Sequence, residues 1–282
     1  MLPKSAYKKK RPPWLKVRYV NSSHYKKVGD AIKANDINTV CESANCPNIF
    51  ECYSSLSLTF LILGDKCTRS CSFCRVESST NLLLDLDEPK RVAKTASDLK
   101  LKRTVITSVT RDDILDGGAG LFASTISMTR VKNPNCHLEV LIPDFLGRKT
   151  SLSIIFKARP DILAHNIETV RRLYPKLRPQ GDYGRSLKVL SLSKQAGFVT
   201  KSGIMVGLGE KRDEVIEVMK DVRANGTDIF TIGQYLRPSP NHHPISRYYR
   251  PFEFSELRSI GLKIGFSTVI SGPLVRSSYR TG

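Results

Sequence analysis

Residues 57–74 read SLTFLILGDKCTRSCSFC, and this stretch decides the fold. Its first seven residues form an apolar run that a Gly-Asp pair ends, which predicts a buried β-strand followed by a turn. Three cysteines, Cys67, Cys71 and Cys74, follow at once. In barrels of parallel strands the active site lies at the carboxyl ends of the strands. The stretch therefore predicts a strand that leads directly into a cysteine site at that edge.

Other apolar runs bounded by turn residues recur along the chain, and helical patterns separate them. The expected strands are residues 104–109, 138–142, 162–165, 203–208, 229–232 and 267–270. The expected helices include residues 151–157, 186–195 and 212–225. Strand and helix in alternation are typical of parallel βαβ units. We expect an α/β fold, a partial (β/α)6-type TIM barrel with N-terminal and C-terminal extensions; periodicity alone leaves a doubly wound sheet as the alternative.

Three parts of the chain are distinguished by composition and motifs. Residues 1–56 form a basic arm with a cysteine motif, residues 57–266 form the barrel, and residues 267–282 form a C-terminal segment. In the arm, a Pro-Pro pair followed by Trp14 predicts an extended stretch that one aromatic side chain attaches to the body. The first residues lack the long Arg- and Ser-rich pattern of an organelle presequence, so we expect a cytoplasmic bacterial protein or one synthesised inside an organelle.

The composition restricts the function classes. The chain has 282 residues, 40% of them hydrophobic, and a formal net charge of +19. No apolar run approaches the roughly 18–20 residues that span a bilayer, so we expect no membrane partner. The charge suits nucleic acid or an acidic protein partner, and it is equally compatible with an ordinary lysine-rich surface.

Six of the seven cysteines lie between residues 41 and 74. Such clustering in a long chain indicates reduced thiols that bind metal, because disulfide frameworks spread over small secreted domains. They form a first triplet, Cys41, Cys46 and Cys52, and a second triplet, Cys67, Cys71 and Cys74. A cubane iron–sulfur cluster normally takes four cysteines, and structural zinc also prefers four protein ligands. We therefore expect two metal centres, each completed by a group other than cysteine.

Polar and glycine residues come directly after several of the expected strands. They are residues 111–113, 143–144, 166–168, 207–210 and 233–234. Each alone is compatible with ordinary turn chemistry. Because the carboxyl ends of barrel strands share one rim, we expect these residues to lie on the same side of the barrel as the second triplet.

The Cys-x3-Cys-x2-Cys spacing of the second triplet, with Phe73 before the last cysteine, resembles the motif of the radical S-adenosylmethionine enzymes. This resemblance implies that the second triplet is catalytic and holds a 4Fe–4S cluster, whose open iron binds S-adenosylmethionine. One-electron cleavage of that cofactor gives a 5′-deoxyadenosyl radical, which removes hydrogen from an unactivated carbon. The resemblance also implies cofactor contacts from Phe73 to adenine, from Thr107 and Ser108 to the methionine amine, and from Asn166 and Glu168 to the ribose.

The Cys-x4-Cys-x5-Cys spacing of the first triplet is similar to a motif of the lipoyl synthases. Long blocks elsewhere in the chain resemble the same family, at residues 107–119, 139–145, 165–170, 200–210, 231–236 and 271–279. The resemblance covers about residues 12–282 and implies a second, auxiliary 4Fe–4S cluster on the first triplet. It further implies that Ser278, in the Arg-Ser-Ser-Tyr block, is a catalytic ligand that completes this cluster. Tyr53, where the family commonly has tryptophan, is a departure that touches no expected ligand.

The reaction that the resemblance implies is the insertion of two sulfur atoms, at C6 and C8 of a protein-bound octanoyl-lysine. The sulfur comes from the auxiliary cluster. Partners would be octanoylated lipoyl carrier domains, namely 2-oxoacid dehydrogenase E2 subunits and the glycine cleavage H protein, with a reductant such as ferredoxin or flavodoxin. No nucleic acid partner is expected. The alternatives are a radical methylthiotransferase that acts on RNA or protein, and an electron-transfer or zinc module without catalytic activity.

Overall fold

The computed structural model describes residues 11–17, 22–80 and 83–278. Seven parallel strands form its main sheet, in the order β1-β4-β5-β6-β7-β8-β9. They are β1 (Thr59–Ile62), β4 (Arg103–Ser108), β5 (His137–Leu141), β6 (Ile162–Ala164), β7 (Val199–Val206), β8 (Ile229–Gln234) and β9 (Thr268–Gly272). Neighbours in the sheet follow one another in sequence, so the order never reverses as it does in a doubly wound sheet. The partial barrel is confirmed and the doubly wound alternative is wrong.

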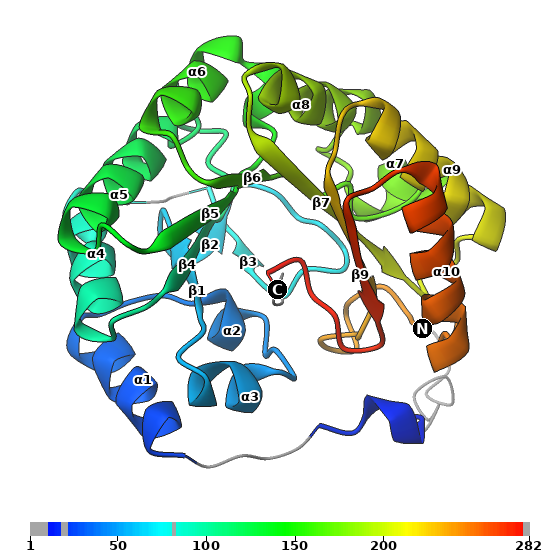
Figure 1. Cartoon of the computed structure of the whole chain (residues 1–282), viewed down its shortest axis with the longest axis horizontal. Coiled ribbons are helices and arrows are strands. Elements are labelled where there is room, and N and C mark those ends of the chain that lie inside the picture. Colours follow the sequence, from blue (N-terminus) through cyan, green and yellow to red (C-terminus); the bar gives the residue numbers. More distant parts are fainter. Residues whose placement is uncertain (1–10, 18–21, 81–82, 279–282) are drawn as a thin grey trace.

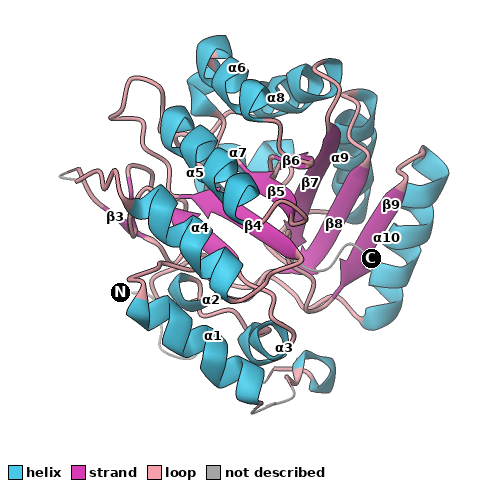
Figure 2. Ribbon diagram, turned by 60° about the vertical axis from the view of Figure 1, so that its left-hand side comes forward, coloured by secondary structure: helices cyan, strands magenta, loops and turns pink. Residues whose placement is uncertain are grey.

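Helices surround the sheet and place every strand on the inside, as Figures 1 and 2 show. They are α4 (Glu88–Asp98), α5 (Ala119–Lys132), α6 (Lys149–Ala158), α8 (Tyr183–Gln195), α9 (Arg212–Ala224) and α10 (Pro251–Ile264). Shorter helical segments are η2 (Pro13–Leu15), η3 (Phe145–Gly147), η4 (Arg171–Leu173) and α7 (Tyr174–Leu177). Among the described strands β1 and β9 lie at the two edges, so the barrel is open.

Strand β9 is one more than the six of a (β/α)6-type barrel. It pairs with β8 from Ile229↔Thr268 to Gly233↔Gly272. The sheet therefore continues past residue 266, into the segment expected to be a C-terminal extension. The chain after β9 turns into the middle of the ring (Figure 1).

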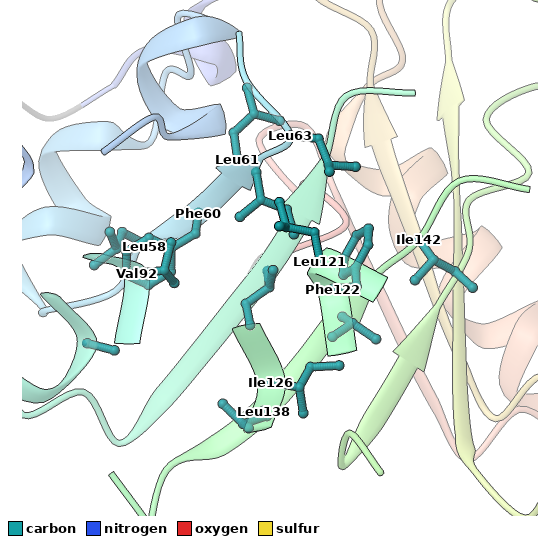
Figure 3. Close-up of a cluster of buried hydrophobic side chains, with 14 of the residues drawn as sticks. Leu58, Phe60, Leu61, Leu63, Val92, Leu121, Phe122, Ile126, Leu138 and Ile142 are labelled. Atoms are coloured by element: carbon teal, nitrogen blue, oxygen red, sulfur yellow. The ribbon is translucent and has the colours of Figure 1, made fainter. Parts of the chain in front are cut away.

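Apolar side chains fill the space between the sheet and the helices. Figure 3 shows part of this core, in which Ile126 of α5 lies beside Leu138 of β5. The approach of α5 to the loop after β1 is so close that a Cβ on Gly118 would lie 2.3 Å from a methyl group of Leu63. Gly118 also has a φ of +86°, so this close approach requires glycine.

Strand β7 begins four residues earlier than its apolar run predicted, because Thr200, Lys201 and Ser202 are polar and still buried. Lys201 is fully buried inside the barrel, where its ammonium lies 2.8 Å from a carboxylate oxygen of Glu139 on β5. Arg103 of β4 donates to the other oxygen of the same carboxylate. A buried charge is tolerated when it is paired and hydrogen-bonded. Hydrophobicity alone could not detect this part of the strand.

The N-terminal part forms three helices, which are α1 (Ser23–Ala34), α2 (Val40–Ser43) and α3 (Ile49–Ser54). Tyr25 of α1 stacks on Phe50 of α3, with ring centroids 5.3 Å apart. Nearer the start of the chain, the indole N–H of Trp14 donates to the carbonyl of Tyr249 at 3.1 Å. The predicted attachment of the arm by its tryptophan is confirmed, but the stretch around Trp14 is the 3-10 helix η2 and not extended. No helix within the described ranges has the length and apolar character needed to cross a bilayer.

Candidate active site

The second triplet lies on a loop between two short paired strands, β2 (Lys66–Cys67) and β3 (Glu77–Ser78). Backbone bonds fix this loop to the rim of the barrel. The amide and the hydroxyl of Thr68 both donate to the carbonyl of Thr110, which follows β4, at 2.9 Å. On the other side, the amide of Ser72 donates to the carbonyl of Leu177 at 3.0 Å. The expected position of the second triplet at the carboxyl ends of the strands is confirmed.

The thiols of the second triplet are partly withdrawn from solvent. The Cys67 sulfur accepts backbone N–H groups of Thr110 at 3.2 Å and of Arg69 at 3.4 Å. Burial, together with negative charge on the other two cysteines, raises the pKa of Cys74 to about 12. Burial also raises the pKa of Cys71, against the positive charge of Arg178. Such thiols stay protonated until a metal replaces the proton, since metal ligation deprotonates cysteine.

Arg69, inside the second triplet, ties the cysteine loop to two other loops. Its guanidinium donates to both carboxylate oxygens of Asp112, at 2.7 and 3.0 Å, and to Asp144 at 2.6 Å. Asp144 is fully buried and also accepts from Arg185 at 2.7 Å. These partners hold the pKa of Asp144 below its usual range even though burial acts to raise it. The loops after β4 and β5 thus fix the cysteine loop through one buried arginine.

Asn166 and Glu168 follow β6 and lie beside the second triplet. The amide of Asn166 donates to the Glu168 carboxylate at 3.0 Å. Glu168 has a left-handed φ of +69°, which its backbone bonds to Gly203 and Met205 of β7 maintain at 2.9 Å each. Burial raises the pKa of Glu168, and the charge of Arg178 lowers it. A strained, buried acidic residue of this kind indicates a functional position.

Several buried polar atoms near this rim have no hydrogen-bond partner among the described residues. The side-chain oxygens of Asn166 and Ser108 are two of them. Buried polar atoms are nearly always paired, so these two are suited to a polar ligand. The hydroxyl of Thr107, by contrast, already donates to the carbonyl of Leu141 at 2.8 Å. Of the two residues predicted to contact the methionine amine, Ser108 is therefore the one whose hydroxyl is available.

Phe73 packs its ring against the core of β7 and β8. This leaves its backbone at the rim, as a backbone contact to adenine requires. Together with the Asn166–Glu168 pair and the unpaired oxygens, these residues fit a nucleoside cofactor that carries ribose hydroxyls and an amino group. The contacts themselves stay predictions.

The first triplet lies on α2, on α3 and on the turn between them. Cys41 is buried, and Cys46 donates its backbone N–H to the carbonyl of Cys41 at 2.9 Å. Burial, together with negative charge on Cys46 and Cys52, raises the pKa of Cys41 to about 12. Thr39 bonds the Tyr53 hydroxyl at 3.0 Å, so Tyr53 supports the helices that carry these cysteines.

The segment after β9 reaches the first triplet from the far end of the chain. The side-chain amide of Asn48, between Cys46 and Cys52, donates to the carbonyl of Leu274 at 2.7 Å. Arg276 donates to the carbonyl of Gln234 at 3.4 Å, and negative charge on Cys46 would raise its pKa, which burial lowers. Ser278 is half-buried two residues further on. The structure thus brings the C-terminal block to the first triplet, and the iron ligand role of Ser278 stays a prediction.

Neither triplet converges on a single point. In the described ranges no group of three His, Cys, Asp or Glu side chains is arranged to hold one metal ion. Thiolates around one zinc ion each lie about 2.3 Å from it, whereas those around a cubane bind three different irons.

Several residues of this site could not be recognised from the sequence. The position of Arg69 between two cysteines puts it on the cysteine loop, but its aspartate partners come from loops that are distant in the sequence. His242 and His243 have the sequence context of ordinary loop residues, yet both contact the second triplet or its surroundings. Cys136 is buried and donates to the Thr104 hydroxyl at 3.1 Å, which agrees with a plain thiol outside both motifs.

Sequence comparison assigns this architecture to known proteins. The family model of the Radical SAM superfamily matches residues 61–222. A lipoyl synthase of Rubrobacter xylanophilus is 52% identical over 271 residues, which are 95% of this chain and 84% of the relative. A lipoyl synthase of Mycobacterium leprae is 48% identical over 273 residues, 97% of this chain and 87% of the relative.

Solved structures give the same fold. Methylornithine synthase superposes with a TM-score of 0.57 at 17% identity, over 93% of this chain and 82% of that one. Coproporphyrinogen III oxidase from Escherichia coli, a radical SAM enzyme, superposes with a TM-score of 0.51 at 11% identity, over 73% of this chain and 52% of that one. At such identities the similarity shows the fold alone.

Proposed function

The chain belongs to the lipoyl synthase family of the Radical SAM superfamily, and on that premise we propose that it inserts two sulfur atoms, at C6 and C8, into an octanoyl chain on a lysine of a lipoyl carrier domain. It is a radical SAM sulfur-inserting enzyme. The family implies one 4Fe–4S cluster and S-adenosylmethionine. The second cluster, the carrier and the reductant belong to the proposal.

The observation that carries the proposal is the contact between the first triplet and the segment after β9. An enzyme that only generated a radical would need the second triplet alone. Here Asn48 holds Leu274, and Arg276 lies near Cys46. A separate three-thiol site that the C-terminal segment contacts through Asn48 supports an auxiliary cluster that donates sulfur.

Each set of residues has its own task in this proposal. Cys67, Cys71 and Cys74 hold the radical-generating cluster, and Arg69 keeps their loop on the rim. Asn166 and Glu168 accept hydrogen bonds from the ribose hydroxyls, and the Ser108 hydroxyl accepts a hydrogen bond from the methionine amine. When bound, the cluster and S-adenosylmethionine supply one-electron chemistry that removes hydrogen from unactivated carbon. The protein orients these groups and keeps water out, which is its usual share in cofactor chemistry.

Cys41, Cys46 and Cys52 hold the auxiliary cluster, and Ser278 is its fourth protein ligand. A serine oxygen is a hard ligand in a sulfur-rich site, so it is suited to leave when the cluster is dismantled. Because two sulfur atoms depart with each product, the auxiliary cluster acts as a substrate that must be rebuilt.

The formal charge of +19 suits acidic carrier domains, because opposite charges speed association. The expected carriers are 2-oxoacid dehydrogenase E2 subunits and the glycine cleavage H protein, and the expected reductant is ferredoxin or flavodoxin. A cytoplasmic location belongs to the same proposal. A radical methylthiotransferase is set aside, since relatives matched over nearly the whole chain are lipoyl synthases.

The test is incubation of an octanoylated carrier peptide with the reconstituted enzyme, S-adenosylmethionine and a chemical reductant, followed by mass spectrometry. The expected product has gained two sulfur atoms. A Cys46→Ala variant is the matched control, since it keeps the second triplet and should cleave S-adenosylmethionine without sulfur insertion. Loss of hydrogen without sulfur in the intact enzyme would contradict the proposal.

A further inference from the structure

Two adjacent histidines in the loop after β8 bond to the second triplet from outside it. The imidazole Nε2 of His242 lies 2.9 Å from the carbonyl oxygen of Cys74. Because a carbonyl only accepts, this nitrogen carries the hydrogen, and Nδ1 accepts from the Ser239 hydroxyl at 2.8 Å. One residue on, the backbone N–H of His243 donates to the carbonyl of Ser72 at 2.8 Å. The cysteine loop is thus held at two of its carbonyls.

The same histidine pair contacts a second loop, residues 207–210, which follows β7. The imidazole Nε2 of His243 lies 2.9 Å from the carbonyl of Leu208 and donates to it by the same reasoning. Three residues further, the amide of Ser246 donates to the carbonyl of Gly207 at 2.8 Å. That loop is itself rigid, because both oxygens of the Glu210 carboxylate accept backbone N–H groups within it, at 2.6 and 2.8 Å.

The loop of residues 207–210 continues β7, whose backbone holds Glu168 in its strained conformation. Glu168 in turn accepts from Asn166, whose side-chain oxygen has no partner in the described part of the chain. A continuous set of contacts therefore runs from Cys74, through the histidine pair, to the strand that positions the acceptors for the nucleoside.

The histidine pair is also fixed from behind. The hydroxyl of Tyr235 donates to the carbonyl of His243 at 2.8 Å, and the guanidinium of Arg237 donates to the carbonyl of His242 at 2.8 Å. Both rings are half-buried. Their positions are consequently set by β8 and its loop, independently of any ligand.

From this arrangement we propose that His242 and His243 are positioning residues that couple the cluster loop to the S-adenosylmethionine site. They act through the backbone of the cysteine loop and of residues 207–210. The coupling is reciprocal: an ordered cluster loop favours cofactor binding, and a bound cofactor protects the cluster loop. The inference rests on the proposed use of the second triplet as a cluster site.

The first test uses the cluster-free protein and measures alkylation of each cysteine by peptide mass spectrometry. His242→Leu and His243→Leu should raise the alkylation rates of Cys71 and Cys74 about 3- to 10-fold, the effect of one lost hydrogen bond. The first triplet is the internal reference and should not change. His242→Gln and His243→Gln, which keep an N–H donor at similar reach, should restore the rates of the unmodified protein.

The second test uses the reconstituted enzyme and follows S-adenosylmethionine binding through the electron paramagnetic resonance spectrum of the reduced cluster. The leucine variants should bind as much iron as the unmodified protein, but their dissociation constant for S-adenosylmethionine should be raised about 3- to 10-fold. His137→Leu is the matched control, since His137 is exposed at the amino end of β5, away from both loops. Its binding should equal that of the unmodified protein.

The results separate the inference from the proposed function. If the unmodified chain binds iron and S-adenosylmethionine while both leucine variants behave like it in both tests, the coupling is refuted. Equal loss of protection at both triplets would also refute it, because that is general destabilisation. If the unmodified chain holds no cluster on the second triplet, the proposed function fails first.

Discussion

Adding one methyl group at Gly233 of β8 should disturb the first triplet and leave the second triplet unchanged. A Cβ built there lies 2.1 Å from the carbonyl oxygen of Val275, well inside the 3.4 Å at which ordinary contact begins. Gly233→Ala must therefore shift either β8 or the segment after β9. Strand β8 is paired on both edges, so we expect the segment after β9 to move.

The cost of each response can be worked from the contacts. Overpacking that the surroundings resist costs about 1–3 kcal/mol. Release of the segment exposes Val275, which is only 8% exposed, at about 1.5 kcal/mol for a valine side chain. It also loses the bond from Asn48 to Leu274, worth about 1 kcal/mol. The strain of overpacking and the free energy of releasing the segment after β9 are therefore similar. A change of about one to two kcal/mol raises the fraction of molecules with this segment released about 5- to 30-fold.

The assay is alkylation of the cluster-free protein, resolved by cysteine, together with iron retention after reconstitution. Gly233→Ala should speed alkylation of Cys46 at least severalfold and leave Cys71 unchanged. It should also make about half of the bound iron labile. Gly29→Ala is the matched control, because a Cβ at Gly29 meets nothing within 4 Å. Unchanged Cys46 protection and stable iron in Gly233→Ala would refute the role of the C-terminal segment.

Three further substitutions test other parts of the site. Ser278→Ala should leave iron binding at both triplets but abolish most sulfur insertion, measured on the carrier peptide; full insertion would remove Ser278 from the reaction. Asp144→Asn breaks a fully buried ion pair with Arg69, so it should cost about 3–5 kcal/mol in chemical denaturation, whereas Lys94→Met, at an exposed pair, should cost about 0.3–0.5 kcal/mol; equal effects would contradict the importance of the buried pair. Burial, followed by the charge of Arg178, lowers the pKa of His165 to about 4, below the unfolded value of about 6.5, so the stability that neutral His165 contributes is complete above pH 6.5 and is lost as the pH falls toward 4. His165→Gln should reduce the change in the free energy of unfolding over this pH range by up to about 3 kcal/mol. An unchanged curve of stability against pH would show that His165 does not titrate in this way.

The strands were predictable because they are short apolar runs ended by turn residues. The run at residues 57–63 contains β1, and that at residues 229–232 lies within β8. Strand β7 was placed too late, because Lys201 and its neighbours are polar yet buried. Only the tertiary partner, Glu139 on β5, makes that burial possible, and no local pattern in the sequence reports it.

The cysteine spacing singles out both triplets, because ligands of one metal site are often close in sequence, and their role as cluster ligands stays a prediction. Contacts between distant segments were beyond such reasoning. Asp144 and Arg69 are 75 residues apart, and His242 and Cys74 are 168 apart. Nothing in the spacing of these residues indicates that they meet, because the barrel, by curving into a ring, brings the ends of separate strands together. The family resemblance, by contrast, singled out Ser278 without showing what holds its segment in place.

The claim that cluster sulfide bound to the chain supplies the sulfur is tested most directly by isotope labelling. The chain would be reconstituted with iron and heavy-isotope sulfide, freed of excess sulfide, and reacted once with an octanoylated carrier peptide, S-adenosylmethionine and a reductant. The account predicts that both sulfur atoms of the product are heavy and that no more than one product forms per chain. Product that contains light sulfur, or more than one turnover without added sulfide, would contradict it.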